Sequence, residues 1–254
     1  MTINQAFEIL KAAGDIRAAR IITDNIKHLS RLRVWWIARA LRRGIPVAKI
    51  IHNKWFYGLA FYTNRHTLDP RPDTETLVSA VISDNPHAPN ILDLGTGTGC
   101  IIAALVKNIY NARGTGLDIS RGAIRVARKN IKKHKLNDRI KIVRASFARP
   151  NAIKEKFDII VSNPPYIAYG DPRVNHAAHA DPKIALYAKN GGNAAYQQIA
   201  TNAKNWLADG GKIYLEIGAG AAATVQNIFE RAGWTFVRSE RDLGGIIRVL
   251  VFTF

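Results

Sequence analysis

Strand and helix patterns alternate along the chain from residue 90 to its end, and this alternation constrains the fold most strongly. Short apolar strands are predicted at 90–94, 115–119, 140–144, 157–162, 212–217, 234–239 and 246–254. Helical periodicity predicts helices at 100–110, 120–134, 196–207 and 221–232. This order favours an α/β fold in which helices cover both faces of a largely parallel sheet.

The part of the chain before residue 90 follows a different pattern. Apolar residues at helical spacing from 3 to about 43 predict two to four helices, and the aromatic-rich stretch 46–62 predicts a short hairpin or irregular packing segment. Pro70 and Pro72 then prevent a helix in the next segment. We therefore expect an N-terminal helical domain at 1–62, a linker at 63–89 and an α/β domain at 90–254.

Composition excludes several classes of protein. The chain has 254 residues, of which 47% are hydrophobic and 22% charged, so wholesale disorder is excluded. A single cysteine excludes a disulfide framework and a cysteine-built zinc site. No run approaches the roughly 18 apolar residues of a membrane span, and no secretory h-region is visible. We expect a cytoplasmic monomer with no membrane partner.

The chain is strongly basic. Its 37 Lys and Arg residues against 19 Asp and Glu give a net charge of +18, and residues 119–156 hold 13 basic and 2 acidic side chains. Such a field favours polyanions or an acidic protein as partner. A general bias of composition towards lysine and arginine explains the same charge without any partner, so both interpretations stay open.

A glycine-rich turn joins the predicted strand 90–94 to the helix that follows. In the sequence DLGTGTG at 93–99, alternate glycines allow a sharp turn and the close approach of a ligand at a helix N-terminus. Asp118 ends the next strand, where its carboxylate can accept ribose hydroxyls. Asp93, beside the glycines, suits an ammonium or sulfonium better than a pyrophosphate. The pattern therefore indicates S-adenosyl-L-methionine rather than a dinucleotide.

A second motif, Asn163-Pro164-Pro165-Tyr166, directly follows the predicted strand 157–162. Neither proline has an N–H, so the turn offers carbonyl oxygens and the amide oxygen of Asn163. Two acceptors match the two hydrogens of an NH2 group, and Tyr166 can stack on a planar amide or base. Holding both hydrogens would favour a pyramidal nitrogen and stabilise the positive charge of in-line attack on a methyl group. This chemistry requires no metal or covalent nucleophile.

Other polar residues carry weaker signals. His176 and His179 lack a nearby cysteine or a paired acid at ligand spacing, so no metal site is predicted. Cys100 opens an apolar helix and is expected in the core. Glu216 ends a predicted strand, and the sequence leaves open whether it is a structural carboxylate or a pocket residue.

At these motifs the sequence resembles the peptide chain release factor N5-glutamine methyltransferases (the PrmC/HemK family), from about Pro46 to the C-terminus. The shared elements are PRPDTE at 70–75, DLGTGTGC at 93–100, GLDIS at 116–120, SNPPY at 162–166 and LEIG at 215–218. The resemblance implies a Rossmann-like class I methyltransferase with a seven-stranded mixed sheet and a small N-terminal helical domain. It also implies methylation of the GGQ glutamine of class-1 release factors.

The resemblance assigns roles by position. Asn163, Pro164 and Tyr166 would be catalytic, and the substrate would also contact Pro165, Arg71 and Pro72. The cofactor would be bound by Asp93, Gly95, Thr96, Gly97, Thr98, Gly99, Asp118, Ser146, Phe147 and Asn163. Two features depart from the family: Ser146 stands where an acidic residue is common, and the N-terminal region is short. That region would dock the body of the protein substrate.

An alternative function uses the same Asn-Pro-Pro-Tyr chemistry. A nucleic-acid amino-group methyltransferase of the adenine-N6 type would also exploit the basic surface, but it needs a target-recognition element or a base-flipping pocket. No insertion of that size follows Tyr166, and the PRPDTE segment is unexplained by it. Nucleic acid is therefore not the favoured substrate.

Overall fold

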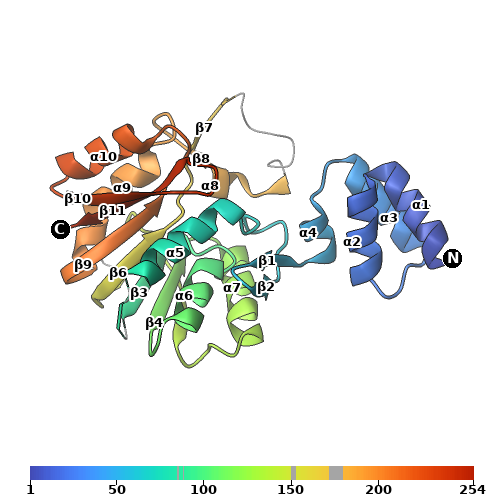
Figure 1. The fold of residues 1–254 in the computed structure, drawn as a ribbon, viewed down its shortest axis with the longest axis horizontal. Coiled ribbons are helices and arrows are strands. Elements are labelled where there is room, and N and C mark those ends of the chain that lie inside the picture. The colour runs from blue at the N-terminus through green and yellow to red at the C-terminus, as the bar shows by residue number, and fades with distance from the viewer. Residues whose placement is uncertain (85, 88, 150–152, 172–179) are drawn as a thin grey trace.

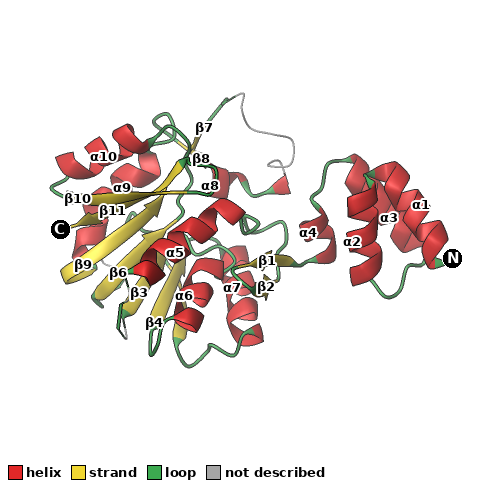
Figure 2. Cartoon of the chain, viewed as in Figure 1, coloured by secondary structure: helices red, strands yellow, loops and turns green. Residues whose placement is uncertain are grey.

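The computed structural model describes residues 1–84, 86–87, 89–149, 153–171 and 180–254. A helical unit at the N-terminus lies at one end of the molecule, and a layered α/β domain lies at the other (Figure 1). Figure 2 shows the helices of the larger domain packed on either side of its strands.

The central sheet has seven strands within the described residues. They are β3 (Asn90–Leu94), β4 (Arg113–Asp118), β5 (Ile140–Arg144), β6 (Phe157–Ser162), β9 (Leu207–Glu216), β10 (Thr235–Arg241) and β11 (Ile247–Thr253). Their order is β10-β11-β9-β6-β3-β4-β5, and β11 runs antiparallel to both of its neighbours while the other pairs are parallel. The predicted seven-stranded mixed sheet is confirmed.

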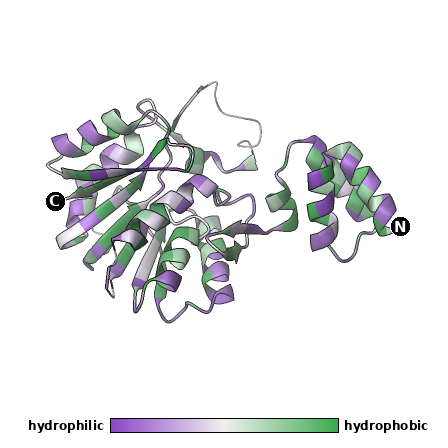
Figure 3. Ribbon diagram, viewed as in Figure 1, coloured by the Kyte–Doolittle hydropathy of each residue, from purple (hydrophilic) through white to green (hydrophobic). Residues whose placement is uncertain are grey.

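Helices cover both faces of this sheet (Figure 1). One face carries α5 (Glu75–Ser83), α6 (Cys100–Asn108) and α7 (Arg121–Lys133), and the other carries α9 (Ala194–Asn202) and α10 (Ala222–Arg231). Because successive side chains of a strand point to opposite faces, Ile91 joins the first core and Leu92 the second. Hydrophobic residues, green in Figure 3, run along the strands between these helices.

The C-terminal half of β9 was predicted correctly, but its beginning was not. The sequence predicts a helix over 196–207, whereas the helix α9 ends at Asn202 and a 3-10 turn, η4 (Ala203–Asn205), follows. Leu207 then pairs with Phe157 of β6, so the strand begins five residues earlier than expected. Pairing with a neighbouring strand outweighs the local helical pattern there.

The N-terminal unit contains α1 (Ile3–Ala13), α2 (Ile16–Asn25), α3 (Arg31–Arg42) and the short α4 (Val47–Ile51). Side chains of Thr2, Asp15 and Ser30 accept backbone N–H groups at the starts of the first three helices. The apolar faces form a hydrophobic cluster separate from those of the sheet domain. The expected helical unit therefore has a core of its own.

A β-hairpin connects this unit to the larger domain. Its strands are β1 (Lys54–Phe56) and β2 (Leu59–Phe61), joined through Tyr57 and Gly58, which both have positive φ as a tight two-residue turn requires. Phe56 and Phe61 are buried in the core under α5, α6 and α7. Hydrophobic contact therefore joins the hairpin to the core of the larger domain.

A buried ion cluster also crosses this junction. The Nζ atom of Lys49, on α4, lies 2.8 Å from Asp69 Oδ1 and 2.9 Å from Asp181 Oδ1, and all three side chains are nearly inaccessible. Thr63 donates its hydroxyl to Asp69 at 2.5 Å. Removing one partner would leave a buried charge unpaired. The cluster therefore fixes α4 against the two segments on which Asp69 and Asp181 lie.

Asp84, at the end of α5, clamps that helix to β9 and β10 and gives a stability prediction. Burial alone would raise the pKa of Asp84, but hydrogen bonds from Lys212, Tyr214 and Arg238 outweigh it and lower the pKa to about 2. A pKa below the unfolded value means that the carboxylate stabilises the fold above pH 4 and loses this effect between pH 4 and 2. Asp84→Asn should cost about 2 kcal/mol of unfolding free energy at pH 7. Urea melts should show the difference shrinking below pH 3; a pH-independent difference would contradict the clamp.

Candidate active site

The strand order creates a ligand crevice. From β3 the chain proceeds outwards through β4 and β5 and then returns to place β6 on the other side of β3. Ligands of open α/β sheets bind at the carboxyl ends of the strands where the order reverses in this way. The turn after β3 and the Asn163–Tyr166 turn after β6 therefore lie at one edge, and Ser162 donates its hydroxyl to Leu94 O at 2.7 Å between the two strand ends.

The glycine turn leaves open space above it. Gly95, Gly97 and Gly99 have φ values of +78°, +55° and +78°, which other residues rarely adopt. A Cβ built on Gly95 would meet nothing within 4 Å, and one on Gly97 would meet only Gly95 O at 3.8 Å. The N–H groups of Gly95 and Thr96 donate to Leu117 O, which fixes the turn against β4.

Asp93 stabilises this turn through its buried side chain. Its side chain is fully buried and accepts the Thr96 hydroxyl at 2.6 Å, while Oδ1 has no hydrogen-bond partner among the described residues. Burial raises the pKa of Asp93 to about 7. Asp93 does not line the cavity, so its direct contact with a cofactor stays a prediction.

Asp118 presents an oriented carboxylate at the end of β4. One oxygen accepts Gly97 N–H at 3.0 Å, and the other accepts Ser120 N–H at 2.8 Å. Burial raises the pKa of Asp118. Each oxygen keeps further lone pairs, and Asp118 lines the cavity. The arrangement suits the acceptance of two neighbouring hydroxyls.

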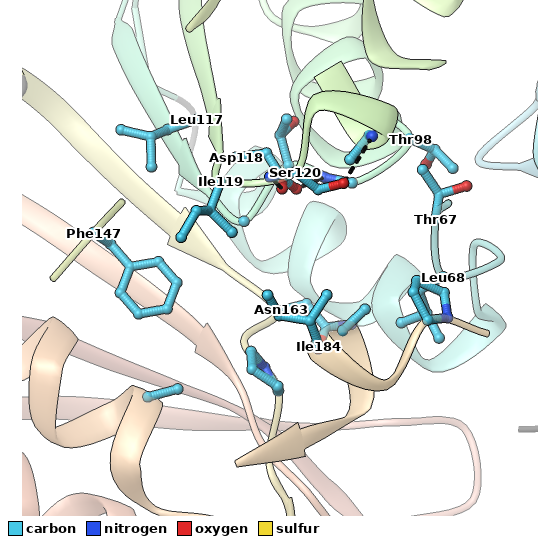
Figure 4. Close-up of a pocket in the computed structure, with 18 of the residues that line it drawn as sticks. Thr67, Leu68, Thr98, Leu117, Asp118, Ile119, Ser120, Phe147, Asn163 and Ile184 are labelled. Carbon is cyan, nitrogen blue, oxygen red and sulfur yellow. Dashed lines mark hydrogen bonds between the residues drawn. The ribbon is translucent and has the colours of Figure 1, made fainter. Parts of the chain in front are cut away.

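The cavity at this edge measures about 290 Å³. Eight of the ten expected cofactor residues line it: Gly95, Thr96, Gly97, Thr98, Asp118, Ser146, Phe147 and Asn163. Gly99 does not; a Cβ there would contact Ala127 of α7 at 3.5 Å, so Gly99 serves close helix packing. In Figure 4, Phe147 and Ile119 occupy one end of the cavity, Leu68 and Thr67 the other, and Asn163 lies between them.

Ser146 and Phe147 follow β5. The Ser146 hydroxyl accepts Ala148 N–H at 3.1 Å, and the Phe147 carbonyl accepts Asn202 Nδ2 at 3.1 Å. These bonds fix the backbone so that the Phe147 ring faces the cavity (Figure 4). The ring, with Ile119 nearby, forms an apolar wall suited to a flat heterocycle.

The Asn163–Tyr166 turn is only partly exposed to the cavity. Asn163 and Pro165 line it, whereas Pro164 and Tyr166 do not. Tyr166 instead packs against Gly218, where an added Cβ would lie 3.1 Å from the ring. Stacking of Tyr166 on a substrate therefore stays a prediction.

The side-chain amide of Asn163 has a defined orientation. Its Nδ2 donates to Thr74 Oγ1 at 3.1 Å, and no donor reaches Oδ1 within the part of the chain that is described. Oδ1 is thus available as an acceptor in the cavity that Asn163 lines.

The PRPDTE segment forms η1 (Pro72–Thr74), a 3-10 turn that leads into α5. Arg71 lines the cavity and its Nη2 lies 2.7 Å from Asp181 Oδ2, while Pro72 is exposed and lies outside the cavity lining. The buried Thr74 accepts a hydrogen bond from Asn163 Nδ2. Glu75 accepts the Tyr57 N–H at 2.8 Å, and this hydrogen bond holds the β1–β2 hairpin. The motif therefore serves the site chiefly through Arg71 and Thr74.

Glu216 also belongs to this region. It is almost completely inaccessible at the end of β9, and its Oε2 has no hydrogen-bond partner among the described residues. Burial raises the pKa of Glu216 to about 7. Because Glu216 does not line the cavity, the structure favours a buried structural carboxylate over a pocket residue, the two alternatives that the sequence left open.

Much of the cavity wall was not predicted from the sequence. Two segments contribute nine of its residues, namely His66, Thr67, Leu68, Asp69, Pro182, Ile184, Ala185, Tyr187 and Ala188. The second segment contains α8 (Lys183–Leu186), and its strand β8 (Tyr187–Ala188) pairs with β7 (Ile167–Ala168). These residues carry no motif. Ile119 could have been predicted from the sequence, because it directly follows Asp118 at the end of a strand. An apolar side chain at that position suits contact with a nucleobase.

Two features are absent from the described residues. No group of three or more potential ligand side chains is placed to hold a metal ion there, and His176 and His179 lie outside those residues. Within the same ranges, no helix has the length and apolar character that crossing a membrane requires.

Comparison with known proteins agrees with the fold. A family model described as methyltransferase small domain matches residues 66–181. A crystal structure of a methyltransferase from Pyrococcus furiosus superimposes with a TM-score of 0.60 at 17% identity, covering 87% of this chain and 96% of that one. The fold is therefore that of class I methyltransferases.

Relatives of known name are more specific. The release factor glutamine methyltransferase of Agrobacterium fabrum is 40% identical over 82% of this chain and 74% of its own length. A bifunctional methyltransferase of Rickettsia bellii is 36% identical over 91% of this chain, which spans about half (47%) of that longer protein. The chain belongs to the release factor glutamine methyltransferase family, as its motifs indicated.

Proposed function

We propose that this chain transfers a methyl group from S-adenosyl-L-methionine to the side-chain amide nitrogen of the GGQ glutamine of class-1 release factors. The observation that carries the proposal is the orientation of Asn163. Its amide nitrogen is held by Thr74, which leaves Oδ1 as an acceptor at the cavity. The names of the relatives support the same substrate.

The residues present fit the cofactor. The space above Gly95 and Gly97 accommodates a ligand that approaches the backbone closely, and the Asp118 carboxylate suits ribose hydroxyls. Phe147 and Ile119 suit the faces of an adenine. When bound, S-adenosyl-L-methionine supplies an electrophilic methyl group on its sulfonium.

The chain's own contribution to the reaction is hydrogen bonding and orientation. The lone pair of an amide nitrogen is delocalised, so the nitrogen is a poor nucleophile. Asn163 Oδ1 and the Pro164 carbonyl would each accept one amide hydrogen, which favours a pyramidal nitrogen and stabilises its developing positive charge. Pro164 and Pro165 have no N–H that could compete for these acceptors. Fixing the amide in line with the methyl group supplies much of the remaining acceleration.

Methyl transfer from labelled cofactor tests this function. Purified full chain is incubated with a class-1 release factor, with the same factor carrying alanine in place of the GGQ glutamine, with total RNA and with DNA. We expect label in the first sample only, located on the glutamine by mass spectrometry. Label in RNA or DNA but not in the release factor would replace the proposal with the nucleic-acid alternative.

The N-terminal helical unit is proposed as the docking surface for an acidic part of the release factor. Trp35 and Trp36 of α3 are about half exposed, and the Arg39 guanidinium lies 5.7 Å from the centre of the Trp35 ring. Arg42 is exposed one turn further along the helix. Exposed aromatic rings with adjacent arginines are typical of protein contacts.

Charge reversal on α3 tests the docking proposal without removing the hairpin, whose Phe56 and Phe61 belong to the catalytic core. Arg39→Glu with Arg42→Glu should raise the KM for intact release factor about tenfold, because each reversal turns attraction into repulsion. The KM for a short GGQ peptide should not change, and added salt should reduce the effect.

The matched control for this test is Arg125→Glu with Lys132→Glu on the exposed face of α7, which changes the net charge equally. Equal increases in KM for both double variants would show that the positive charge of the whole chain attracts the release factor and that α3 is not a specific docking surface. We further propose that the chain is a cytoplasmic monomer.

A further inference from the structure

Gln198 is a polar side chain of the cavity that has no role in the proposed mechanism. It lies on α9, is exposed, and lines the cavity together with Ala194 and Ala195 of the same helix. Its carboxamide has no hydrogen-bond partner among the described residues. A carboxamide offers an acceptor oxygen and two donor hydrogens. Gln198 therefore brings unused hydrogen-bonding groups to the cavity.

The helical spacing of α9 places Gln198 beside Phe147. Side chains four residues apart lie one above the other on a helix, so Ala194, Gln198 and Asn202 form one row. The first two line the cavity, and Asn202 Nδ2 donates to Phe147 O at 3.1 Å. Phe147 also packs against the hydrophobic cluster that contains Ile199 of α9. Gln198 therefore lines the cavity at the end that Phe147 occupies in Figure 4.

The connectivity of the cofactor decides which part of it reaches this end. The sulfonium belongs near Asn163, because its methyl group passes to a nitrogen held there. The ribose, joined to this sulfur through C5′, fits the oriented carboxylate of Asp118. The adenine lies on the far side of the ribose and is expected near Phe147, away from Thr67 and Leu68 at the other end (Figure 4). The part of the cofactor within reach of α9 is therefore the adenine.

The edge of an adenine needs a donor and an acceptor side by side. Its amino group donates, and the ring nitrogen next to that group accepts. One carboxamide satisfies both, because its oxygen accepts the amino hydrogen while its NH2 group donates to the ring nitrogen. The Ser146 hydroxyl already accepts Ala148 N–H at 3.1 Å and has one hydrogen left to donate, so it suits a ring nitrogen better than an amino group. Gln198 is the better match for the amino group.

We propose that Gln198 recognises the adenine edge of S-adenosyl-L-methionine and makes the site selective for a purine with a 6-amino group. The proposed function assigns no partner to that amino group, so the inference goes beyond it. It rests on the proposed cofactor and is independent of the substrate that receives the methyl group.

Titration calorimetry with two ligands tests the inference. S-adenosyl-L-homocysteine carries the amino group, and its 6-deamino analogue, with unsubstituted purine in place of adenine, lacks it. Wild type should bind the first about tenfold more tightly than the second, as one lost hydrogen bond implies. Gln198→Met keeps the side-chain length without the carboxamide, and its affinities for the two ligands should differ by less than about threefold. Gln198→Ala, which an exposed helix position accommodates, should give the same result.

Gln197→Met is the matched control on the same helix. Gln197 Oε1 accepts Asn190 Nδ2 at 2.9 Å, and Gln197 does not line the cavity. This variant should keep the wild-type preference between the ligands. Thermal melting without ligand checks that each variant is folded.

The outcomes separate this inference from the proposed function. A folded Gln198→Met that keeps the wild-type preference, or that loses affinity for both ligands equally, would overturn the role of Gln198 and leave the proposed function intact. Wild type that did not bind S-adenosyl-L-homocysteine would refute the cofactor and the inference together. A preference that depends on Gln198, without methyl transfer to the release factor, would retain the inference and refute the substrate.

Discussion

Asn163→Ala should lower turnover of the release factor by a factor of about 10² to 10³ or more, the range seen when one preorganised hydrogen-bonding group is removed from a transition state. The substitution removes Oδ1, the acceptor that Thr74 keeps free at the cavity. Affinity for S-adenosyl-L-methionine should stay within tenfold of wild type, because the glycine turn and Asp118 remain. Single-turnover methyl transfer and calorimetry measure the two quantities.

The matched control for Asn163→Ala is Asn137→Ala, an exposed asparagine in the loop before β5 at the opposite edge of the sheet. It should leave both quantities unchanged. Turnover of Asn163→Ala within threefold of wild type would show that the amide hydrogens are accepted by other groups, and the proposed chemistry would then be wrong.

Asp118→Ala should weaken cofactor binding by about 1.5–3 kcal/mol for each charge-assisted hydrogen bond lost to the ribose, which is at least about tenfold in Kd. Asp118 also accepts the N–H groups of Gly97 and Ser120, so part of the loss comes from a less ordered turn. Titration calorimetry with S-adenosyl-L-homocysteine measures the change without turnover.

Two further variants separate the contributions at Asp118. Asp118→Asn keeps one acceptor oxygen and should give an intermediate affinity, while the exposed Asp138→Ala removes the same charge without touching the site. If Asp118→Ala bound the product as tightly as wild type, the ribose partner would have to lie elsewhere in the cavity.

The fold and the centres of both motifs could be predicted from the sequence because their signals are local. Periodicity over ten to fifteen residues identified the strands and helices of the sheet domain, and the order of those elements implied a doubly covered sheet. Gly95, Gly97, Asp118 and Asn163 could be singled out because each lies at, or just after, the carboxyl end of a predicted strand. Parallel strands bring such ends to one edge of a sheet whatever the details of packing.

The tertiary structure decided what depends on residues far apart in the sequence. Thr74 and Asn163 are separated by 89 positions, yet Asn163 Nδ2 donates to Thr74 Oγ1, and no local pattern predicts that contact. The start of β9 and the placement of the hairpin were likewise set by partners elsewhere in the chain. Neighbouring residues in the sequence determine which secondary structure each segment favours. Contacts between distant segments are determined instead by the packing of the whole core. The identity of the site was therefore determined by the sequence, and the orientation of its key amide only by the folded structure.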